Sequence, residues 1–327
     1  MKWLKIILTI VAIALLSLII YLFRPVSGIP DPPEFGCYNL SKGHYIHLDS
    51  LPLTNHIYGV GLTYSGHLKE TGSSFNKDVP PPLFKKSLSS LCRDGEKVSI
   101  PNKNEMLGAC NEIEPDLNNL LTEYNEDMSA LLDYEVELGM ILLEDIKKGN
   151  LDNDDFIPKV GYFISNDLSA RTIALLGEGK SNKYDYWGIS KSFAGFTPVG
   201  SQIWVPNKHQ KDGLLCTRIE TLVNGEIRQS QTTNNMVFTP MDMIKFVSEK
   251  YPNNGLNSGD MILTGTPAGV AIATPKALLR LGNLVGMDRF KKLDLKINSD
   301  LTPFLKKGDL VEVRGEGLGS VSVQLID

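Results

Sequence analysis

"YEVELGMILL", residues 134–143, places Glu135 and Glu137 on either side of one valine within an otherwise apolar run. The alternation predicts a β-strand, and residues two apart on a strand point to the same side. The two carboxylates therefore share one face, with their Cα atoms roughly 6 to 7 Å apart. The opposite face of this predicted strand is apolar throughout and comprises Val136, Leu138, Met140 and Leu142.

The paired glutamates have two interpretations. One is ordinary alternation on a strand whose polar face meets solvent. Against it, the carboxylate face becomes apolar directly after Glu137, with Gly139, Ile141 and Leu143. Two carboxylates beside an apolar surface repel each other unless a cation lies between them, and their oxygens favour Mg²⁺, Ca²⁺ or Mn²⁺. The second interpretation is therefore two ligands of a metal site.

A metal site of this kind needs a third oxygen ligand, and Asp167 is the best candidate. It follows an apolar predicted strand in "KVGYFISNDLSAR", residues 159–171, just where a helix is predicted to begin. The alternative role for Asp167 is the N-cap of that helix. Local sequence alone leaves both roles open.

The chain as a whole has the texture of a β-rich α+β domain. Short apolar runs alternate with Gly, Asn, Asp and Pro turn signals. "LVNGEI", residues 222–227, predicts a hairpin because Asn-Gly supplies the positive φ angles of a type I′ turn. Helices are fewer, and we predict two, over residues 167–177 and 239–251, with Asp167 and Thr239 as their caps.

The amino terminus predicts a membrane anchor over residues 1–24. Residues 6–23 carry no charge, and an 18-residue helix would be about 27 Å long. A cleaved signal peptide is the alternative, but its apolar core is normally shorter and its exit smaller. Because Lys2 and Lys5 outweigh Arg24, we expect a single-pass protein with a cytoplasmic amino terminus and its folded domain on the far side.

Beyond the anchor, the sequence predicts a Pro/Gly-rich spacer over residues 25–44 and one folded domain over residues 45–327. Within that domain, insertions are expected near residues 102–132 and 275–305. Their composition assigns them no function, so surface elaboration is the simplest interpretation.

Composition and motifs exclude several classes of function. The 33 basic and 38 acidic residues give a net charge of −5, which offers no electrostatic footprint for nucleic acid. The sequence has no GxSxG motif, P-loop or dinucleotide fingerprint. The four cysteines are scattered without a CxxC pair; buried thiols are the default interpretation, and a disulfide stays open.

Eight blocks together resemble the fumarylacetoacetate hydrolase superfamily, in order and over nearly all of residues 57–323. The resemblance implies a mixed β-roll with a few helices, a homodimer, and substrates that are 2-oxo acids bearing a second carbonyl, such as acylpyruvates. The blocks are "GLTYSGHLKE", "PPLFKKSLSSL", "DYEVELGMIL", "ISNDLSAR", "WGISKSFAGFTPVG", "LVNGEIRQ", "GDMILTGTPAGV" and "KKGDLVEVRGEGLG".

The resemblance also implies roles for individual residues. Glu135, Glu137 and Asp167 match the metal-binding carboxylates of the family, with Mg²⁺ or Mn²⁺ as the usual ion. His67 and Glu70 match a dyad on a short lid helix, and three-residue spacing on a helical turn does make such side chains neighbours. Three further matches are Lys191 to an active-site lysine, Thr266 to a threonine that contacts the substrate carboxylate, and Lys86 to a lysine near the site.

The implied reaction is hydrolysis of a C–C bond in an acylpyruvate-type diketo acid. His67, oriented by Glu70, would activate water, while the metal and Lys191 would stabilise the departing enolate. Decarboxylation or isomerisation on the same metal site, and a non-catalytic binding module, are the alternatives. The sequence departs from the family pattern where Leu62 and Thr63 replace an arginine and an asparagine, where Ser87 replaces a proline, and where Thr172 replaces a common acidic residue.

Overall fold

The strand predicted at the paired glutamates is β8 (Val136–Leu142), and Glu135 immediately precedes it. β8 lies between β9 (Val160–Asn166) and β16 (Met261–Leu263) and pairs antiparallel with both. These strands are the centre of a seven-stranded sheet with the order β2-β12-β9-β8-β16-β3-β4. Its outer strands are β2 (Gly43–His47), β12 (Gln202–Pro206), β3 (Ile57–Val60) and β4 (Leu83–Lys86).

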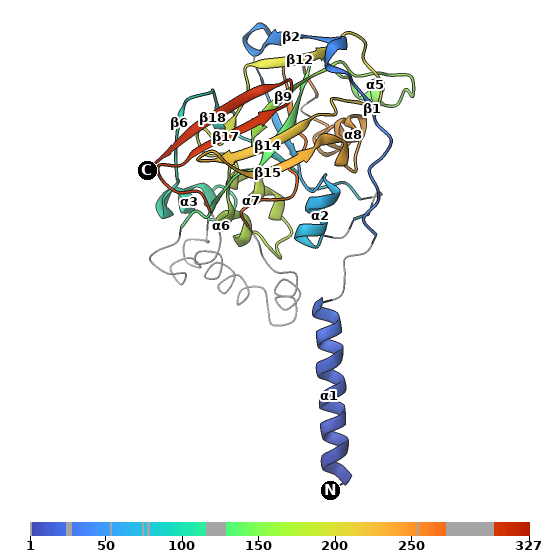
Figure 1. Cartoon of the computed structure of the whole chain (residues 1–327), viewed down its shortest axis with the longest axis vertical. Helices are drawn as coiled ribbons and strands as arrows, with labels where there is room; N and C mark the ends of the chain where they lie inside the picture. Colours follow the sequence, from blue (N-terminus) through green and yellow to red (C-terminus); the bar gives the residue numbers. More distant parts are fainter. Residues whose placement is uncertain are drawn as a thin grey trace.

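This computed structural model describes residues 2–23, 28–52, 54–73, 75–76, 79–115, 129–253, 255–272 and 304–327. A second sheet, of five strands, packs against the first in the order β15-β14-β17-β18-β6 (Figure 1). Its strands are β15 (Glu226–Thr232), β14 (Arg218–Val223), β17 (Leu310–Gly315), β18 (Gly319–Ile326) and β6 (Lys97–Ser99).

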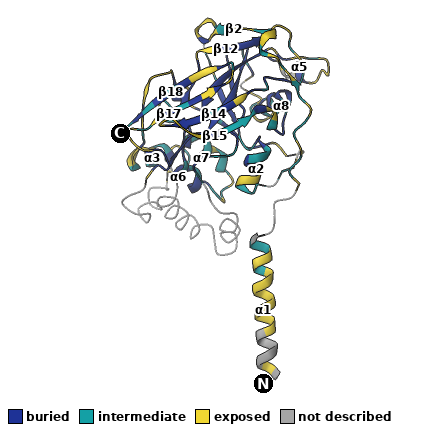
Figure 2. Ribbon diagram, viewed as in Figure 1, coloured by how far each residue is buried: buried dark blue, intermediate teal, exposed yellow. Residues whose placement is uncertain are grey.

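The two faces of β8 enter different parts of the core, which confirms the predicted alternation. Val136 and Leu138 belong to the cluster that also contains Ile219 and Val313 of the five-stranded sheet. Ile141 belongs to a separate cluster on the other face. Burial of both faces explains why the strand is so apolar past Glu137. Figure 2 shows the resulting buried interior between the sheets.

The predicted hairpin is confirmed at the junction of β14 and β15. Val223 and Glu226 are cross-strand partners, and the two residues between them, Asn224 and Gly225, have φ angles of 52° and 83°. Positive φ at both positions is what a type I′ turn requires.

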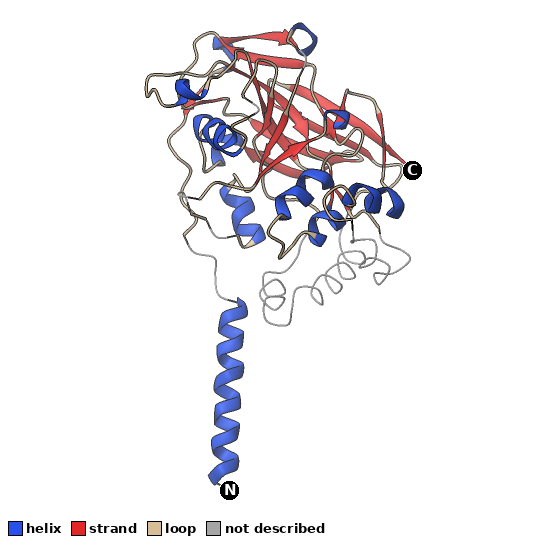
Figure 3. Cartoon of the chain, turned by 180° about the vertical axis from the view of Figure 1, so that it is seen from behind, coloured by secondary structure: helices blue, strands red, loops and turns tan. Residues whose placement is uncertain are grey.

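Helices cover the lower end of the sheets in Figure 3 and lie beside them. α8 (Pro240–Lys250) confirms one predicted helix, since Thr239 caps it in a capping box with Asp242. The other predicted helix begins three residues late, as α6 (Arg171–Leu176) with Ala170 at its N-cap position, because residues 169–170 form a strand instead. The described residues of the domain also contain the helices α2 (Ser65–Thr71), α3 (Lys103–Cys110), α5 (Lys148–Leu151) and α7 (Lys183–Ser190), and the 3₁₀ turns Leu40–Lys42, Leu48–Ser50, Leu88–Ser90 and Thr233–Asn235.

Three short strand pairs complete the domain. Near the first of them, a disulfide joins Cys37 to Cys216 across 179 residues of sequence. The other two cysteines, Cys92 and Cys110, are buried thiols, as expected. The pairs are β1 (Gly36–Cys37) with β13 (Gly213–Leu214), β11 (Thr197–Pro198) with β5 (Leu91–Cys92), and β10 (Ser169–Ala170) with β7 (Leu132–Asp133).

The prediction of a membrane-spanning anchor is wrong. The amino-terminal residues do form a helix, α1 (Lys2–Phe23), which extends away from the sheets in Figure 1. However, no helix in the described part of the chain is long and apolar enough to cross a bilayer. The predicted membrane location and orientation are corrected with it.

The two predicted insertions fall largely outside the described residues. In the first, near 102–132, α3 packs into the core through Met106 and Cys110, while residues 116–128 are not described. The second, near 275–305, coincides with residues 273–303, which are also not described. The domain boundaries at residues 24 and 44 stay predictions.

Candidate metal centre

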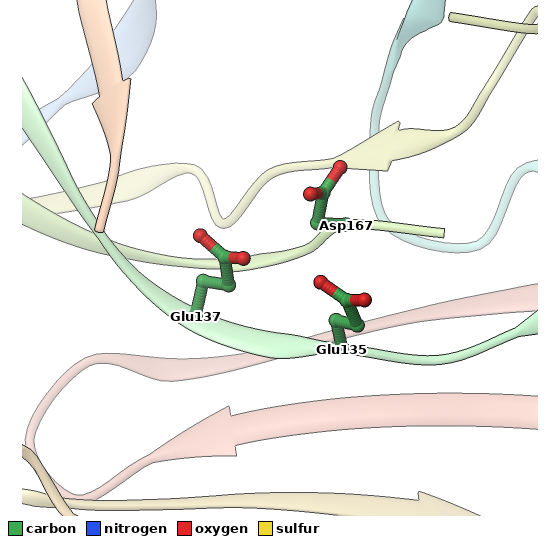
Figure 4. A group of neighbouring side chains, drawn as sticks. All are labelled: Glu135, Glu137 and Asp167. Carbon is green, nitrogen blue, oxygen red and sulfur yellow. The ribbon is translucent and has the colours of Figure 1, made fainter. Parts of the chain in front are cut away.

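Three buried carboxylates meet where β8 begins and β9 ends. Because the two strands are antiparallel with Val136 opposite Asn166, the next residue, Asp167, comes to lie beside Glu135. The Asp167 amide donates to the Glu135 carbonyl at 2.8 Å, which fixes this proximity. Carboxylate oxygens of Glu135, Glu137 and Asp167 lie within 4.8 Å of one another. Figure 4 shows both glutamates projecting from the same side of β8 toward Asp167.

The three carboxylates fit a divalent cation. They supply only hard oxygen atoms, the ligands that Mg²⁺ and Mn²⁺ prefer. Burial, together with the negative charges of Asp167 and Glu135, raises the pKa of Glu137 well above its ordinary value. The charge of Lys191 opposes this rise, and so does the Gly265 amide, which donates to Glu137 Oε2 at 2.8 Å. A cation among the three carboxylates would remove the repulsion that raises this pKa.

Asp167 is not a helix cap, so one of its two predicted roles is wrong. The N-cap position of α6 belongs to Ala170. The Asp167 side chain instead accepts hydrogen bonds from two buried lysines, Lys86 and Lys191. Its carboxylate therefore belongs to the buried charged cluster and makes no cap of α6.

Lys191 and Lys86 bring two positive charges to the carboxylates. Lys191, directly after α7, donates to Glu135 Oε2 at 2.8 Å, to Asp167 Oδ2 at 2.6 Å and to Ser169 Oγ at 2.7 Å. Burial lowers the pKa of Lys86, whereas for Lys191 the charges of Asp167 and Glu135 outweigh burial and raise the pKa. All three protons of the Lys191 ammonium group are thus committed to neighbouring acceptors, and both lysines lie inside the carboxylate cluster.

Two further members of the cluster, Asp133 and Arg171, are absent from the prediction. Arg171 Nε donates to Asp133 Oδ2 at 2.7 Å, and its Nη2 donates to Glu135. Burial alone would raise the pKa of Glu135, but Arg171 and then Lys191 lower it to about 2. Both residues stand in quoted blocks, "DYEVEL" and "NDLSAR", so a search for charges next to the expected ligands would have found them.

The predicted dyad residues are in contact on α2. His67 Nδ1 and Glu70 Oε2 are 2.9 Å apart, and His67 is only 7% exposed. The Gly269 amide donates to the other oxygen, Glu70 Oε1, at 3.0 Å. The same loop also contacts the metal ligands, since the Gly265 amide donates to Glu137 Oε2 at 2.8 Å. The helix, the loop after β16 and the metal ligands therefore form one site.

Thr266 lies beside the metal ligands, but its hydroxyl proton is already committed. Thr266 Oγ1 donates to the Val136 carbonyl at 3.0 Å and accepts from Gln229 Nε2 at 2.9 Å. A substrate carboxylate would have to break the first of these bonds to receive that proton. Thr63, one of the family departures, is buried and donates to the Thr264 carbonyl, while Leu62 has a positive φ of 57°.

The fold and this site define a β-rich domain with a carboxylate centre suited to a divalent metal. Residues 56–326 match the family described as Fumarylacetoacetate (FAA) hydrolase C-terminal, and the chain belongs to that family. The resemblance found in the ordered sequence blocks is thereby confirmed.

Similar proteins carry out more than one reaction. The chain is 29% identical over 242 residues to an oxaloacetate decarboxylase from Dictyostelium discoideum, covering 73% of this chain and 93% of that one. It is 30% identical over 271 residues to a human oxaloacetate tautomerase, covering 80% of this chain and 63% of that one. A fumarylpyruvate hydrolase from Pseudomonas aeruginosa, solved with Mn²⁺ and pyruvate, has the same fold at 18% identity, with a TM-score of 0.55 over 84% of this chain and 91% of that one.

Proposed function

We propose that this protein is a divalent-metal-dependent enzyme that converts a small 2-oxo diacid of the oxaloacetate type through its enolate. The observation that carries the proposal is the group of three buried carboxylates beside Lys191. When bound, a Mg²⁺ or Mn²⁺ ion held by Glu135, Glu137 and Asp167 supplies Lewis-acid polarisation of the 2-oxo group. Oxaloacetate is the first substrate to test because relatives at 29–30% identity are named for it.

The two lysines bind and orient the anionic substrate. In the structure both ammonium groups are held by metal-site carboxylates, so a substrate oxygen bound at the metal would develop its negative charge close to them. A hydrogen bond from an ammonium group to an enolate oxygen is shorter and stronger than one between neutral partners. Lys191, with three acceptors already around it, is the more firmly positioned of the two.

His67 holds or moves the proton. With its Nδ1 proton donated to Glu70, the Nε2 atom retains a lone pair and acts as a base. In a tautomerisation this base removes a proton from the carbon next to the 2-oxo group, and the electron pair moves onto oxygen. In a decarboxylation the electron pair comes instead from the bond to the departing CO₂. No proton then has to be removed from carbon, and one is needed only afterwards, to convert the enolate to the 2-oxo acid.

Hydrolysis of an acylpyruvate, the reaction expected from the sequence, is the second candidate. The 2.9 Å contact between His67 and Glu70 favours it, because an oriented imidazole is also suited to take a proton from water. The oxygen of that water would attack the distal carbonyl, and the C–C bond would break toward the enolate. A homodimer, implied by the family resemblance, stays a prediction.

The test is a substrate panel assayed on the full chain with Mg²⁺ or Mn²⁺ after metal removal. Oxaloacetate, an acylpyruvate and an unsaturated diacid are compared by product identity. We expect E137Q to abolish every reaction, whereas H67A should retain Mn²⁺ binding and lose at least about 100-fold of any step that needs a base. The matched control is D260N, because Asp260 is also buried and also accepts backbone amides, but at the far end of β16.

Two results would contradict the proposal. Undiminished turnover in H67A would remove the dyad from the mechanism. Binding of Mn²⁺ and oxalate without turnover of any substrate would show the non-catalytic binding module that was the alternative from the sequence.

A further inference from the structure

The backbone between the two metal-binding glutamates is held from outside its own sheet. β16 pairs with β8 only at residues 139–141, and Thr264 extends this contact to the Leu138 carbonyl. Val136, between the two glutamates, therefore lies beyond the last residue of β8 that pairs with β16. On the β16 side, the amide and carbonyl of Val136 therefore need hydrogen-bond partners that do not belong to a strand of this sheet.

Gln229 of β15 reaches across from the five-stranded sheet to do this. Its Oε1 accepts from the Val136 amide at 3.0 Å and from Thr221 Oγ1 at 2.7 Å. Its Nε2 donates to Thr266 Oγ1 at 2.9 Å and to the Pro267 carbonyl at 3.0 Å. The side chain is 1% exposed, and all four of its hydrogen-bonding positions are used.

The contacts close into a ring around Val136. Thr266 Oγ1, which accepts from Gln229, donates in turn to the Val136 carbonyl at 3.0 Å. Both backbone polar groups of the valine are thus fixed by two side chains that also bind each other. Any rotation of this peptide would swing Glu135 and Glu137 in different directions, and a metal site tolerates only about 0.5 Å of misplacement.

A glycine allows the loop that contains Thr266 to lie close to Gln229. Gly269 has a φ of +105°, and a Cβ at this position would lie 2.7 Å from the Arg228 carbonyl. The loop therefore packs close enough to β15 for the Gln229 amide to reach both Thr266 and Pro267. No other residue type allows this approach without a shift of the backbone.

We propose that Gln229 is a positioning residue for the metal centre: it sets the orientation of Val136, and with it the convergence of Glu135 and Glu137, and it aligns the Thr266 hydroxyl. The inference rests on the metal-dependent function proposed above. The hydrogen bonds of Gln229 go to Val136, Thr221 and the loop of Thr266 and Pro267, so its effect on the carboxylates passes through Val136 and Thr266.

The experiment compares Q229M with T221V in the full chain. Methionine retains the volume of Gln229 and removes all four hydrogen bonds, whereas T221V removes one of them on the side away from the metal ligands. Mn²⁺ affinity is measured by calorimetry without substrate. We expect Q229M to weaken it at least about tenfold, as loss of groups that orient metal ligands typically does, and T221V to change it less than about twofold.

A second readout separates this inference from the proposed function. Hydrogen exchange at the Val136 amide should accelerate at least about tenfold in Q229M and stay near wild type in T221V, whether or not the protein turns over a substrate. If the wild type binds no Mn²⁺, the proposed function fails while the exchange result still tests the hold on Val136. Should Q229M not fold, T266V against T266S provides the same comparison, because serine retains the hydroxyl of the ring.

Two outcomes overturn the inference. One is an unchanged Mn²⁺ affinity and an unchanged Val136 exchange rate in Q229M, or in T266V if that variant replaces it. The other is an equal loss in Q229M and T221V, which would make Gln229 a structural residue only. Kinetics add a further check, since a positioning role predicts that kcat falls more than KM rises at saturating metal.

Discussion

Ion pairs occur in two very different regions of this molecule. On the outer face of the five-stranded sheet, Arg314 binds Glu220 at 2.7 Å with its side chain 45% exposed. Inside, at the junction of β8 and β9, charged groups of the same kinds contact each other at similar distances, almost without solvent. The interior group contains Asp133, Glu135, Glu137, Asp167, Lys86, Lys191 and Arg171.

The two kinds of ion pair contribute differently to stability. An exposed pair gains little, because water solvates both partners nearly as well as they solvate each other. A buried cluster pays heavily for desolvation, and replacing it with apolar side chains is often neutral or stabilising. The interior has four carboxylates against three cations, so if all were ionised one negative charge would be left uncompensated. That imbalance suits a site that is completed by a divalent cation.

The largest expected effect comes from breaking the interior cluster at Arg171. R171M leaves Asp133 and Glu135 buried without their shared cation, which should cost about 3 to 5 kcal/mol of unfolding free energy. Chemical denaturation of the metal-free protein measures it. A loss below about 1 kcal/mol would mean that water reaches this cluster as freely as it reaches the surface pairs.

Adding the metal should have the next largest effect. At 100 times its dissociation constant, Mn²⁺ should stabilise the folded protein by about 2.7 kcal/mol, because the unfolded chain has no assembled site. Thermal unfolding with and without chelator measures this. D260N should retain the shift and E137Q should lose it; equal shifts in both variants would place the ion elsewhere.

The pH dependence of the metal-free protein should show the two glutamates working in opposite directions. The pKa of Glu137 is raised above its ordinary 4.5, so the folded state retains a proton that the unfolded state releases, and stability falls as pH rises from 4.5 toward that raised pKa. The fall is at most about 1.4 kcal/mol per pH unit. The pKa of Glu135 is lowered to about 2, so its contribution is lost as pH drops from 4.5 toward 2.

Denaturation of E137Q across the same pH range tests the assignment. The glutamine cannot titrate, so the decline above pH 4.5 should become shallower while the acid limb due to Glu135 remains. A decline of unchanged slope would assign it to another group.

The smallest effect is expected on the surface. R314M removes the exposed partner of Glu220 and should change stability by about 0 to 1 kcal/mol, with the difference shrinking further at high salt. Denaturation at low and high salt measures it. A loss comparable to that of R171M would erase the distinction between the two regions.

Local patterns predicted those parts of the molecule that local physics decides. The alternation along β8, the Asn-Gly turn after Val223 and the capping box at Thr239 each depend on residues a few positions apart. The family blocks then brought Asp167 to the glutamates, where its local sequence could not distinguish a cap from a ligand. The structure rules out the cap role, because β10 replaces the first turn of the predicted helix.

The contacts that were missed join residues far apart in the sequence, even where the residues themselves, such as Asp133 and Arg171, stand beside the expected ligands. Gln229 lies 93 residues from Val136, and Arg171 lies 38 residues from Asp133. The cysteine pairing is equally distant, since Cys37 and Cys216 have their Cα atoms 5.3 Å apart only because β1 pairs with β13. No local period encodes such distances, so only an assembled fold can show them.

The disulfide also determines how the protein bears mechanical tension. If the two ends of the chain are pulled apart, the force passes from Cys37 through the sulfur bridge to Cys216 and bypasses everything in between. That bypassed stretch contains β8, β9 and every carboxylate of the metal centre, whereas Gln229 and Thr266, which bind the Val136 backbone, follow Cys216 and lie in the stretch that bears the pull. Reduction of the bridge would release an additional extension of about 600 Å, at roughly 3.3 to 3.6 Å per residue, from the part of the chain that contains the site.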